Sequence, residues 1–400
     1  MVQLSACLIV KNEAMFLSRC LESVRGFADE IIVVDTGSDD NTVEIARSYG
    51  AQVYYFDWVD DFSAARNESL LHAKGDWILY IDADEIIDNA NAVKIRQVIT
   101  RKDINAAIIR QCIPQQAGNV ATAFYSEYCR LFRRHPAIRF EGKIHEQILP
   151  AIERQGGRVL YTDIVIHHWA YAANEEKKRR RAERNLRYLL AELNRVQDDP
   201  FLYYNLGMTY RELGQRDAAI RSLHYALSKD DGRIKRELIG QTHLNLAKLY
   251  LESGDSSSAA HHAQMVATFD PANPLSDYML ATLAVEKGLF KKAILHLENA
   301  LRIAKGEAGV FPNVELNLAQ IYLELGSCRC AAGDFSNAEY DFARSVNLAP
   351  SAALSHLLLG NCRFMRGDLA GAGEMFKRAL SLNPLLEDAR RGLALCYTHE

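Results

Sequence analysis

The second half of this chain repeats one pattern of small and large residues, and this repetition constrains its fold more than any other feature. Frames with the pattern start near residues 200, 240, 274, 319, 353 and 387, so they lie 40, 34, 45, 34 and 34 residues apart. A unit of this length cannot bury its apolar face alone, so neighbouring units have to stack to form a core. The pattern therefore predicts an all-α solenoid of helical pairs over residues 199–400.

The residues at the repeated positions resemble a known repeat family. The two most regular copies carry Gly, Gly, Ala, Phe and Pro in the same order, at Gly326, Gly333, Ala338, Phe342 and Pro350 and at Gly360, Gly367, Ala372, Phe376 and Pro384. They resemble tetratricopeptide repeats, in which small residues let two helices approach, large ones fill the gap and glycine makes the turn. We count about five repeats and expect extra residues at 229–237 and 305–314. A terminal half repeat, from Leu393 to Glu400, would cap the solenoid or pair with a second copy in a homo-oligomer.

The first part of the chain alternates apolar runs with segments of helical spacing. Leu4–Val10 and Glu30–Val34 have the continuous apolar character of buried strands, and residues 15–24 and 42–49 have the spacing of helices. Such runs suit a parallel sheet that is covered on both faces. We expect an α/β domain over residues 1–172, and a connecting helix over residues 173–198 that leads into the repeats.

Acidic residues follow the ends of the predicted strands. Asp35 ends the second apolar run, and Asp82 and Asp84 directly follow the run Trp77 to Ile81. Because ligands of α/β sheets bind beyond the carboxyl ends of strands, these acids are expected to converge on one crevice. Carboxylate oxygens suit Mg²⁺ or Mn²⁺ better than zinc, and such a cation could bridge a nucleotide diphosphate. The Asp-x-Asp triplet alone is also common where a strand gives way to a turn.

Four segments of this domain resemble a known enzyme family. They read CLIVKNE at residues 7–13, IIVVDTGSDDNT at 31–42, DFSAARN at 61–67 and KGDWILYIDADE at 74–85. In order and spacing they resemble the family-2 glycosyltransferases of GT-A fold, which have a Rossmann-like mixed sheet. The resemblance implies a glycosyltransferase of the hexosyl or N-acetylhexosaminyl class that uses a nucleotide sugar, expected to be UDP-linked, with Mn²⁺ or Mg²⁺.

The resemblance also implies roles for single residues. Asp35 would hold the nucleoside, Asp82 and Asp84 would engage the ribose and the metal ion, and Arg66 would face the diphosphate. The residues expected to bind the nucleotide sugar are Val10, Asn12, Glu13, Asp35, Asp40, Arg66, Lys74, Asp82 and Ala83. The expected metal ligands are Asp84, Asp82 and His168.

The segment Ile138 to Glu146 is the expected acceptor side, because it resembles the corresponding segment of peptide-modifying and repeat-bearing members of the family. An inverting transfer needs a base that takes the proton of the attacking oxygen or sulfur. Glu146 is the candidate for this base. The alternatives are that Glu146 pairs with Arg139 or Lys143 in a structural role, or that His145 is the base; otherwise His145 would orient the acceptor or the phosphate.

Two histidines, His167 and His168, stand at the end of an apolar strand. Similar enzymes place a histidine here beside the metal ion or the diphosphate, and Tyr171 gives His168 the better register. Successive strand residues face opposite sides, so only one of the two histidines can face a site. A pair of satisfied core histidines is the alternative interpretation.

Composition limits the partners of this chain. Its 400 residues carry a formal charge of −4 from 47 basic and 51 acidic side chains, so nucleic acid is not a favoured partner. The basic run 177–181 can be a solvated helix face that pairs with Glu175, Glu176 and Glu183, or it can bind anions. Scattered cysteines fit a reducing compartment, and no apolar run is long enough to span a bilayer. We expect a cytoplasmic protein without an integral membrane segment.

The long surface of a solenoid favours a protein or peptide as the acceptor, presenting a Ser, Thr or Cys side chain. Flagellin-like proteins and secreted peptides are acceptors of similar repeat-bearing enzymes. One alternative is a transferase that acts on a cell-surface or lipid-linked saccharide and uses its repeats for assembly. An alternative of another class is a non-catalytic scaffold, which the presence of every expected acid disfavours.

Overall fold

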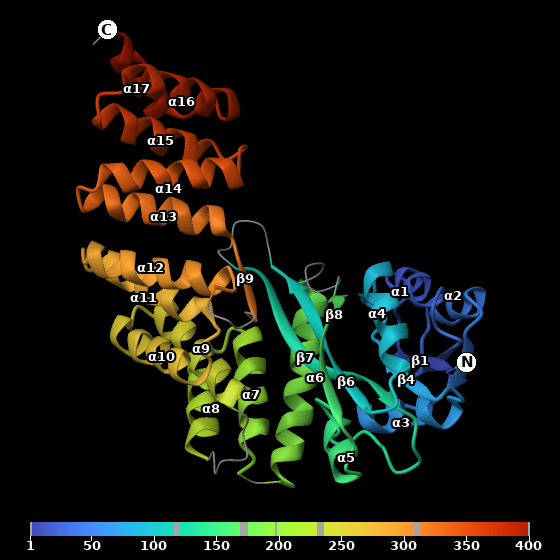
Figure 1. Cartoon of the computed structure of the whole chain (residues 1–400). Coiled ribbons are helices and arrows are strands. Elements are labelled where there is room, and N and C mark those ends of the chain that lie inside the picture. The colour runs from blue at the N-terminus through green and yellow to red at the C-terminus, as the bar shows by residue number, and fades with distance from the viewer. Residues whose placement is uncertain are drawn as a thin grey trace. The chain divides into compact units, whose positions relative to one another are not determined.

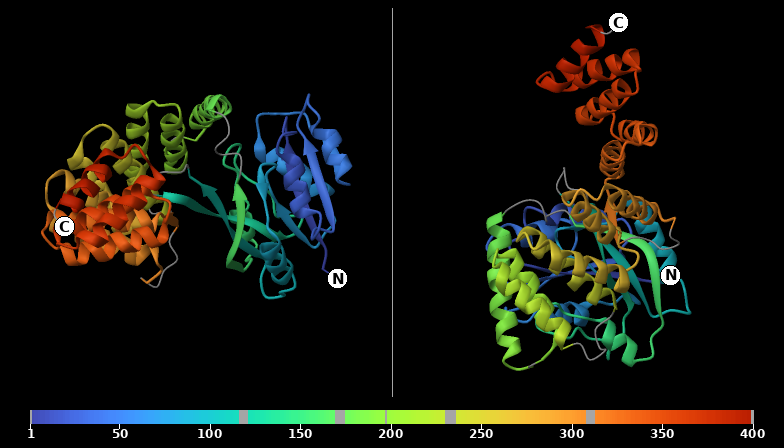
Figure 2. Two further views of the ribbon diagram at one scale, coloured as in Figure 1. Left: turned by 90° about the horizontal axis from the view of Figure 1, so that it is seen from above. Right: turned by 90° about the vertical axis from the view of Figure 1, so that its left-hand side faces the viewer.

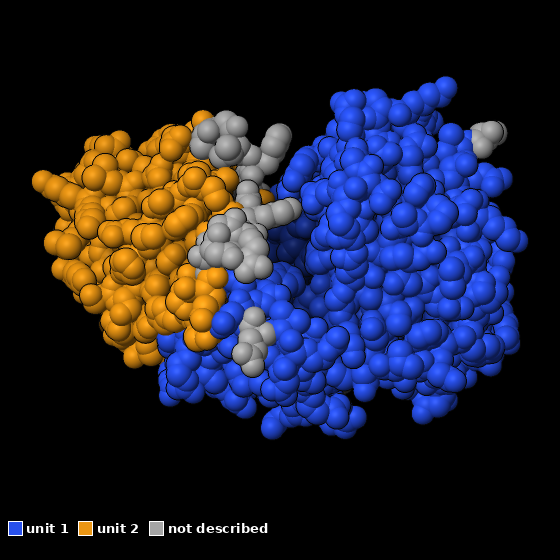
Figure 3. Space-filling model, turned by 90° about the horizontal axis from the view of Figure 1, so that it is seen from below, with its two compact units in different colours: residues 1–115, 123–222 blue, residues 116–122, 223–400 orange. Residues whose placement is uncertain are grey.

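The computed structural model describes residues 2–115, 121–168, 175–196, 198–229, 236–307 and 313–398 (Figure 1). The chain forms two compact units, which Figure 3 shows in different colours. The first unit comprises residues 1–115 and 123–222, and the second comprises residues 116–122 and 223–400. Each unit is described by itself.

A mixed sheet forms the centre of the first unit. Its strands are arranged in the order β3-β2-β1-β4-β7-β6-β8-β5. Strands β1, β2, β3 and β4 run parallel to one another, whereas β7 is antiparallel to both β4 and β6. The bounds are β1 Leu4–Val10, β2 Glu30–Asp35, β3 Gln52–Tyr55, β4 Trp77–Tyr80, β5 Glu85–Ile86, β6 Ala106–Pro114, β7 Ala121–Arg133 and β8 Val159–His168.

Helices cover both faces of this sheet. Helices α1 (Leu17–Val24), α2 (Thr42–Ser48) and α4 (Asn89–Ile99) bury their apolar residues in the core on one face. Helices α3 (Phe62–His72) and α5 (Leu149–Arg154) contribute to the core on the other face. Strand β1 supplies Ala6 to the first core and Cys7 to the second, as expected for a strand buried on both sides.

The predicted strands and helices are present, with differences at their ends. The helix expected over residues 15–24 begins at Leu17, and the strand expected over Glu30–Val34 extends to Asp35. The glycine before β4 is required by close packing, because a Cβ on Gly75 would lie 2.6 Å from Ser5 Oγ. The α/β architecture predicted from the apolar runs is confirmed.

The connecting helix and the first repeat helix belong to the first unit. Helix α6 (Glu175–Leu193) packs along α7 (Pro200–Glu212), and α8 (Arg216–Ser228) begins in this unit. Leu189 of α6 and Leu202 and Leu206 of α7 form one apolar cluster with Ile144. The compact unit around the sheet therefore extends through the first helix of the repeat array.

The second unit is built of consecutive helical pairs, seen from two sides in Figure 2. Positive φ angles occur at the glycines between the helices of each pair, at Gly254, Gly288, Gly333 and Gly367, as at Gly214 in the first repeat. The helices are α9 Arg236–Glu252, α10 Ser256–Phe269, α11 Pro274–Glu286, α12 Phe290–Ala304, α13 Leu318–Ala331, α14 Phe335–Leu348, α15 Ala353–Met365, α16 Leu369–Leu382 and α17 Glu387–Thr398.

Close packing within the pairs confirms the predicted use of small and large residues. A Cβ on Gly326 would lie 2.6 Å from the ring of Phe342, and one on Gly360 would lie 2.7 Å from the ring of Phe376. The first predicted insertion falls largely on residues 230–235, outside the described part. The second lies partly on residues 308–312, also outside the described part, and it ends where a short strand begins that the repeat pattern did not predict, β9 (Val314–Leu316). Among the helices described, none has the length and apolar character that crossing a bilayer would need.

Candidate active site

The acids expected in the site follow the carboxyl ends of neighbouring parallel strands. Val10 is in register with Asp35, and its carbonyl accepts hydrogen bonds from the backbone N and Oγ1 of Thr36 at 2.9 and 3.1 Å. Asp35 is buried and accepts hydrogen bonds from the backbone N of Gly37 and Ser38, both at 3.1 Å. Strand β4 is the other neighbour of β1, so Asp82 leaves the sheet at the same edge.

The loop after β1 is tied to the turn after β2 by side chains from the predicted set. Asn12 has a φ of 56°, donates from its backbone N to Ser38 Oγ and accepts from the backbone N of Asp39, both at 2.9 Å. Asp40 accepts from the backbone N of Ala14 at 3.2 Å, and the backbone N of Glu13 donates to Thr42 Oγ1 at 2.8 Å. These contacts hold Asn12, Glu13, Asp35 and Asp40 around one edge of the sheet.

Arg66 joins two of the predicted site acids. Its Nη2 donates to Asp82 Oδ1 at 2.7 Å, and its Nε donates to Glu146 Oε1 at 2.5 Å. Arg66 belongs to α3, and its side chain is buried, with only 8% of it exposed. The segment that follows β7 therefore lies at the end of β4, and the Arg66 guanidinium holds the carboxylates of Asp82 and Glu146 in place.

A second arginine, which the sequence analysis did not single out, completes this ion cluster. Both terminal nitrogens of Arg130 lie 3.2 Å from Asp82 Oδ2, and its Nη2 also donates to Glu85 Oε1 at 2.9 Å. Glu85 is fully buried, accepts from Gln111 Nε2, and accepts from the backbone N of Asp82 at 2.8 Å. A charged residue inside the apolar run of β7 was the available signal, because a buried charge needs a partner.

Burial and the neighbouring charges shift the pKa values of the two acids in this cluster in opposite directions. Burial alone would raise the pKa of Asp82, but the charges of Arg66 and Arg130 outweigh it and hold that pKa well below its usual range. Burial raises the pKa of Glu85 despite the opposing charge of Arg130. The ring of Tyr80 lies 4.8 Å from the Arg66 guanidinium and 4.5 Å from that of Arg130, and burial raises the pKa of its hydroxyl.

Asp84 does not share the arginine partners of Asp82, and its side chain lies beside His168 instead. His168 Nε2 lies 3.3 Å from Asp84 Oδ2, whereas His167 Nε2 lies 3.5 Å from Asp88 Oδ2. Burial alone would lower the pKa of His168, but the hydrogen bond and charge of Asp84 outweigh it and raise that pKa. Tyr171, which was expected to support the register of His168, lies outside the described residues.

The side chains of His145 and Glu146 contact different parts of the first unit. His145 has a φ of 56°, and its ring lies edge-on to Phe201 of α7 with the centroids 6.4 Å apart. Glu146 instead turns toward Arg66, so its partner is neither Arg139 nor Lys143 as the structural alternative supposed. Arg139 donates to the carbonyl of Ile138.

Lys74 lies at the wrong end of the strands for its predicted role. It precedes the start of β4, and its backbone N donates at 2.5 Å to Glu30, the first residue of β2. The acids lie at the carboxyl ends of the same strands, so we exclude Lys74 from the site.

Ala83 is buried between Asp82 and Asp84. Its side chain is small, so it does not hinder the two carboxylates from pointing in different directions.

The donor atoms present fit a divalent cation in part. Both oxygens of Asp82 are held by arginines, which disfavours its predicted role as a ligand, whereas Asp84 and His168 supply an oxygen and a nitrogen side by side. Within the described ranges, His, Cys, Asp and Glu side chains form no group of three or more that could hold a metal ion. A cation at Asp84 would need further oxygen ligands, of the kind that a diphosphate and water provide.

Comparison with protein families divides the chain in the same way. Residues 5–115 match the model of Glycosyl transferase family 2. Residues 204–274, 244–308 and 316–387 match the model of the Tetratricopeptide repeat. The fold and the two families expected from the sequence are thus confirmed.

Individual proteins match over parts of this chain. A TPR repeat-containing protein of Synechococcus elongatus is 36% identical over 273 residues, which are 66% of this chain and 66% of that protein. The SPbeta prophage-derived glycosyltransferase SunS of Bacillus subtilis is 27% identical over 225 residues, 55% of this chain and 52% of that protein. The chain thus spans just under two thirds of the first relative and about half of the second. Among solved structures, the TPR protein YrrB superposes with a TM-score of 0.43 at 17% identity, covering 51% of this chain and 96% of that one.

Proposed function

Because residues 5–115 form a domain of glycosyl transferase family 2 and tetratricopeptide repeats follow it, we propose that this protein glycosylates a protein or peptide. The reaction is a metal-dependent, inverting transfer of a sugar from a nucleotide sugar, UDP-linked in our proposal, to a Ser, Thr or Cys side chain. We place this activity in the cytoplasm. The acceptor is held by the repeats, and flagellin-like proteins and secreted peptides are the classes we propose for it.

The observation that carries this proposal is the link from Asp82 through Arg66 to Glu146. Asp82 lies in the part of the chain that matches the family model, and Glu146 lies beyond it. The link brings an acid of the donor motif and an acid of the expected acceptor segment into one buried cluster. This is the arrangement that a transfer between two substrates requires, because the reacting groups have to be held in one geometry.

On the donor side, we propose that Asp35 and the loop of Asn12 and Glu13, which the contacts at this edge of the sheet hold together, bind the nucleoside. Arg66 and Arg130 fix the charge and orientation of Asp82, which we propose binds the ribose. Asp84 and His168 would hold a Mn²⁺ or Mg²⁺ ion, which would neutralise the charge that develops on the departing diphosphate.

On the acceptor side, Glu146 is the proposed base. Arg66 donates a hydrogen bond to its Oε1 and fixes the direction of the carboxylate, which leaves Oε2 to receive a proton. The oxygen or sulfur of the acceptor then forms its bond to the anomeric carbon as the bond from that carbon to the diphosphate oxygen breaks. The configuration of the sugar is inverted and the nucleoside diphosphate leaves.

The packing of the first repeat supports a role of the array in holding the acceptor. Leu202 and Leu206 of α7 pack on Ile144, and Phe201 meets His145, so the first repeat helix contacts the segment that carries Glu146. A peptide bound along the first repeat would thereby lie next to the segment that carries the base. We assign His145 to this contact and not to proton transfer.

An assay with intact protein tests the proposal. The enzyme is incubated with Mn²⁺, a set of nucleotide sugars and a library of peptides that differ only in carrying Ser, Thr, Cys or Ala at one position, and products are identified by intact mass. We expect one hexose or N-acetylhexosamine mass on a hydroxyl- or thiol-bearing peptide and none on the Ala peptide. Transfer only to a saccharide acceptor would favour the assembly role of the repeats, and absence of both donor binding and donor hydrolysis would favour a scaffold.

A further inference from the structure

The first unit carries a row of arginines outside the candidate active site. Four of them, on α6, border a hollow of about 570 Å³: Arg179, Arg180, Arg184 and Arg187. Leu213 and Gln215, in the turn after α7, also line this hollow. A second hollow of about 570 Å³ adjoins it at Gln215 and is bordered by Arg216 and Arg221 of α8. We call the two together the arginine furrow.

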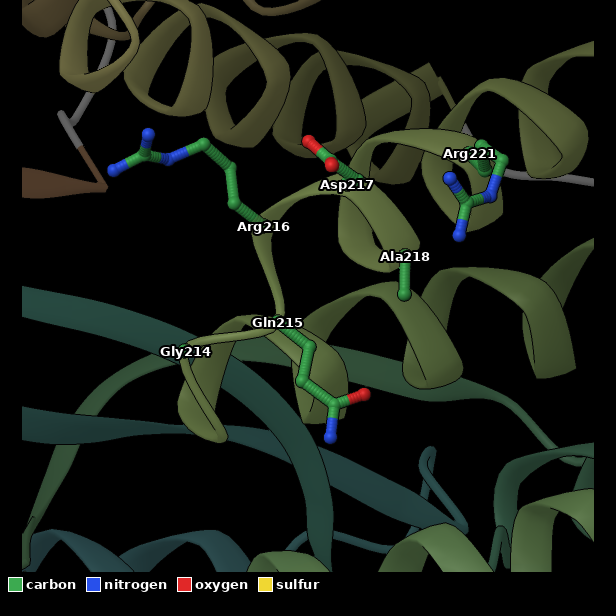
Figure 4. A pocket seen from close by; sticks show the side chains of 6 residues that line it. All are labelled: Gly214, Gln215, Arg216, Asp217, Ala218 and Arg221. Atoms are coloured by element: carbon green, nitrogen blue, oxygen red, sulfur yellow. The ribbon is translucent and has the colours of Figure 1, made fainter.

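The furrow has a charge opposite to that of the chain. Six arginines border it against two acids, Glu183 and Asp217, while the whole chain has a formal charge of −4. Figure 4 shows the guanidinium groups of Arg216 and Arg221 on either side of Asp217, with the side chain of Gln215 directed away from them. A local excess of positive charge in a concave surface attracts anions selectively.

Only part of this charge is used inside the protein. Arg179 pairs with Glu183 at 3.0 Å and Arg180 pairs with Glu176 at 2.6 Å, which confirms the predicted pairing along the helix for these residues. The side chain of Glu175, which was expected to take part, is not among those described. By contrast, Arg187, Arg216 and Arg221 make no hydrogen bond or ion pair with any side chain in the described ranges, and all three are exposed.

The furrow is attached to the segment that carries the proposed base. Tyr188 of α6 donates to Asp60 Oδ1 at 2.5 Å, and the guanidinium of Arg184 lies 5.2 Å from the ring of Phe62 at the start of α3. Arg181 and Glu212 approach to 3.8 Å and link α6 to the end of α7. Helix α6 therefore presents its arginines on one side while its apolar side packs with Ile144, two residues before Glu146.

We propose that the arginine furrow binds an acidic segment of the protein or peptide acceptor, an inference that rests on the proposed function and specifies its acceptor. A carboxylate-bearing peptide matches the arginines, because guanidinium groups bind carboxylates through paired hydrogen bonds. Leu186 and Leu213 in the lining provide an apolar surface for a side chain between the acids. The acceptor is thus recognised at a distance from its modified residue, by charge.

Two other anionic partners fit the furrow less well. A membrane surface is broad and contacts protruding basic residues, whereas these arginines border hollows and the apolar side of α6 is packed on α7. Single-stranded nucleic acid is bound by aromatic platforms together with arginines, and no aromatic residue is among those that line the two hollows in the part of the chain described.

Binding of labelled peptides to the intact protein tests this inference. Fluorescein-labelled octaglutamate is titrated with protein at low salt and followed by anisotropy, and octaglutamine serves as the uncharged probe. We expect octaglutamate to bind, octaglutamine to bind far more weakly, and the difference to shrink as salt is added. Equal affinity for the two peptides would overturn the proposal.

The matched variants localise the binding. Arg187→Gln, Arg216→Gln and Arg221→Gln are combined, and we expect the affinity for octaglutamate to fall about tenfold, since each exposed contact contributes little alone. The control combines Lys287→Gln, Lys291→Gln and Lys292→Gln, which removes the same charge from the corresponding turn of a later repeat and should change the affinity less than about twofold. Equal losses in the two triple variants would overturn the proposal.

Three further readouts separate this inference from its alternatives. Combined Arg→Lys replacements at the same three positions keep the charge but not the paired hydrogen bonds, so they should restore part of the binding that the Gln variant loses, which excludes a folding defect as the cause of the loss. Phosphatidylserine vesicles are tested as competitors of octaglutamate. If they displace it, bind more tightly and depend on the same three arginines, the furrow binds a membrane instead. Nucleotide-sugar affinity should be equal in all variants. If the unaltered protein binds no nucleotide sugar, the proposed function is wrong, whereas the binding of anionic peptides by the furrow is tested separately by the peptide titrations.

Discussion

Arg66 donates a hydrogen bond of 2.5 Å from its Nε to Oε1 of Glu146. The two residues come from different parts of the first unit, since Arg66 lies in α3 and Glu146 follows the long strand β7. Only 8% of the Arg66 side chain and 14% of the Glu146 side chain are exposed, so water screens this pair weakly. The position of the proposed base therefore depends on one buried guanidinium.

Removal of that guanidinium should destabilise the first unit. Arg66→Ala leaves Glu146 without its partner and leaves Asp82 with Arg130 alone, and the loss of one partner from a buried ion cluster costs about 3–5 kcal/mol. Urea denaturation measures this loss. The control is Arg101→Ala, because Arg101 and Asp103 are each 45% exposed and water screens their pair, so its loss should change the stability far less. Equal losses in the two variants would contradict the structural role given to Arg66.

Replacement of the proposed base should separate chemistry from binding. Glu146→Gln keeps the shape of the side chain and an acceptor for Arg66 but cannot take a proton, so transfer should fall by about 10²–10⁴-fold at saturating donor. Donor affinity, measured by calorimetry, should change little. His145→Ala should retain most of the transfer at saturating donor, because its ring packs against Phe201. If His145→Ala lost more transfer than Glu146→Gln, the base would be His145.

Much of the fold could be predicted from sequence because its signals are local. The buried strands β1 and β2 are continuous apolar runs, and the repeats recur with glycine at each turn. The ion cluster could not be predicted in the same way. Arg130 meets Asp82 and Glu85 only because β7 runs antiparallel to β4, and that pairing brings together strands that are far apart in the chain.

The differences between the predicted and the observed arrangement of the site have the same physical origin. Lys74 belongs to a segment with a family resemblance, but it precedes β4, and the sheet places it at the opposite end from the acids. Asp82 and Asp84 are separated by one residue and were expected to share a metal ion, yet Asp82 turns toward two arginines and Asp84 toward His168. The direction of each side chain depends on partners that come later in the chain.

A methyl group added to a repeat glycine should test the packing of the solenoid. In Gly360→Ala the new Cβ would lie 2.7 Å from the ring of Phe376, and such overpacking costs about 1–3 kcal/mol. The loss can be measured by chemical denaturation. Gly373→Ala is the matched control in the next helix, because its Cβ would meet Leu393 at an ordinary 3.8 Å and alanine favours a helix. Phe376→Leu should relieve part of the loss in Gly360→Ala, and a Gly360→Ala variant as stable as Gly373→Ala would contradict the packing described.

Acid should destabilise the repeats through two buried histidines. His243 Nδ1 and His262 Nδ1 lie 2.8 Å apart, and burial, together with the neighbouring histidines His224 and His261, lowers the pKa of each ring from 6.5 to about 4. The folded state then binds fewer protons than the unfolded state between these pH values, so stability present at pH 7 is lost as the pH falls toward 4.

The size of this effect can be measured against a variant. We expect the loss between pH 7 and pH 5 to be on the order of 2 kcal/mol larger for the unaltered protein than for the combined variant His243→Gln and His262→Gln. Denaturation curves at the two pH values give the difference, and the comparison removes the contribution of other groups. An identical pH dependence in the two proteins would show that the histidines titrate normally.

The most direct test of the central claim is calorimetric titration of the intact protein with UDP-sugars in the presence of Mn²⁺ and after chelation. We predict binding of at least one nucleotide sugar that requires the metal ion and weakens by at least about tenfold in Asp84→Asn. Lys74→Gln, at the opposite end of the strands, should bind as the unaltered protein does. Absence of nucleotide-sugar binding with Mn²⁺, or equal binding with and without the metal ion in both Asp84→Asn and the unaltered protein, would contradict a metal-dependent glycosyltransferase built on Asp84 and His168.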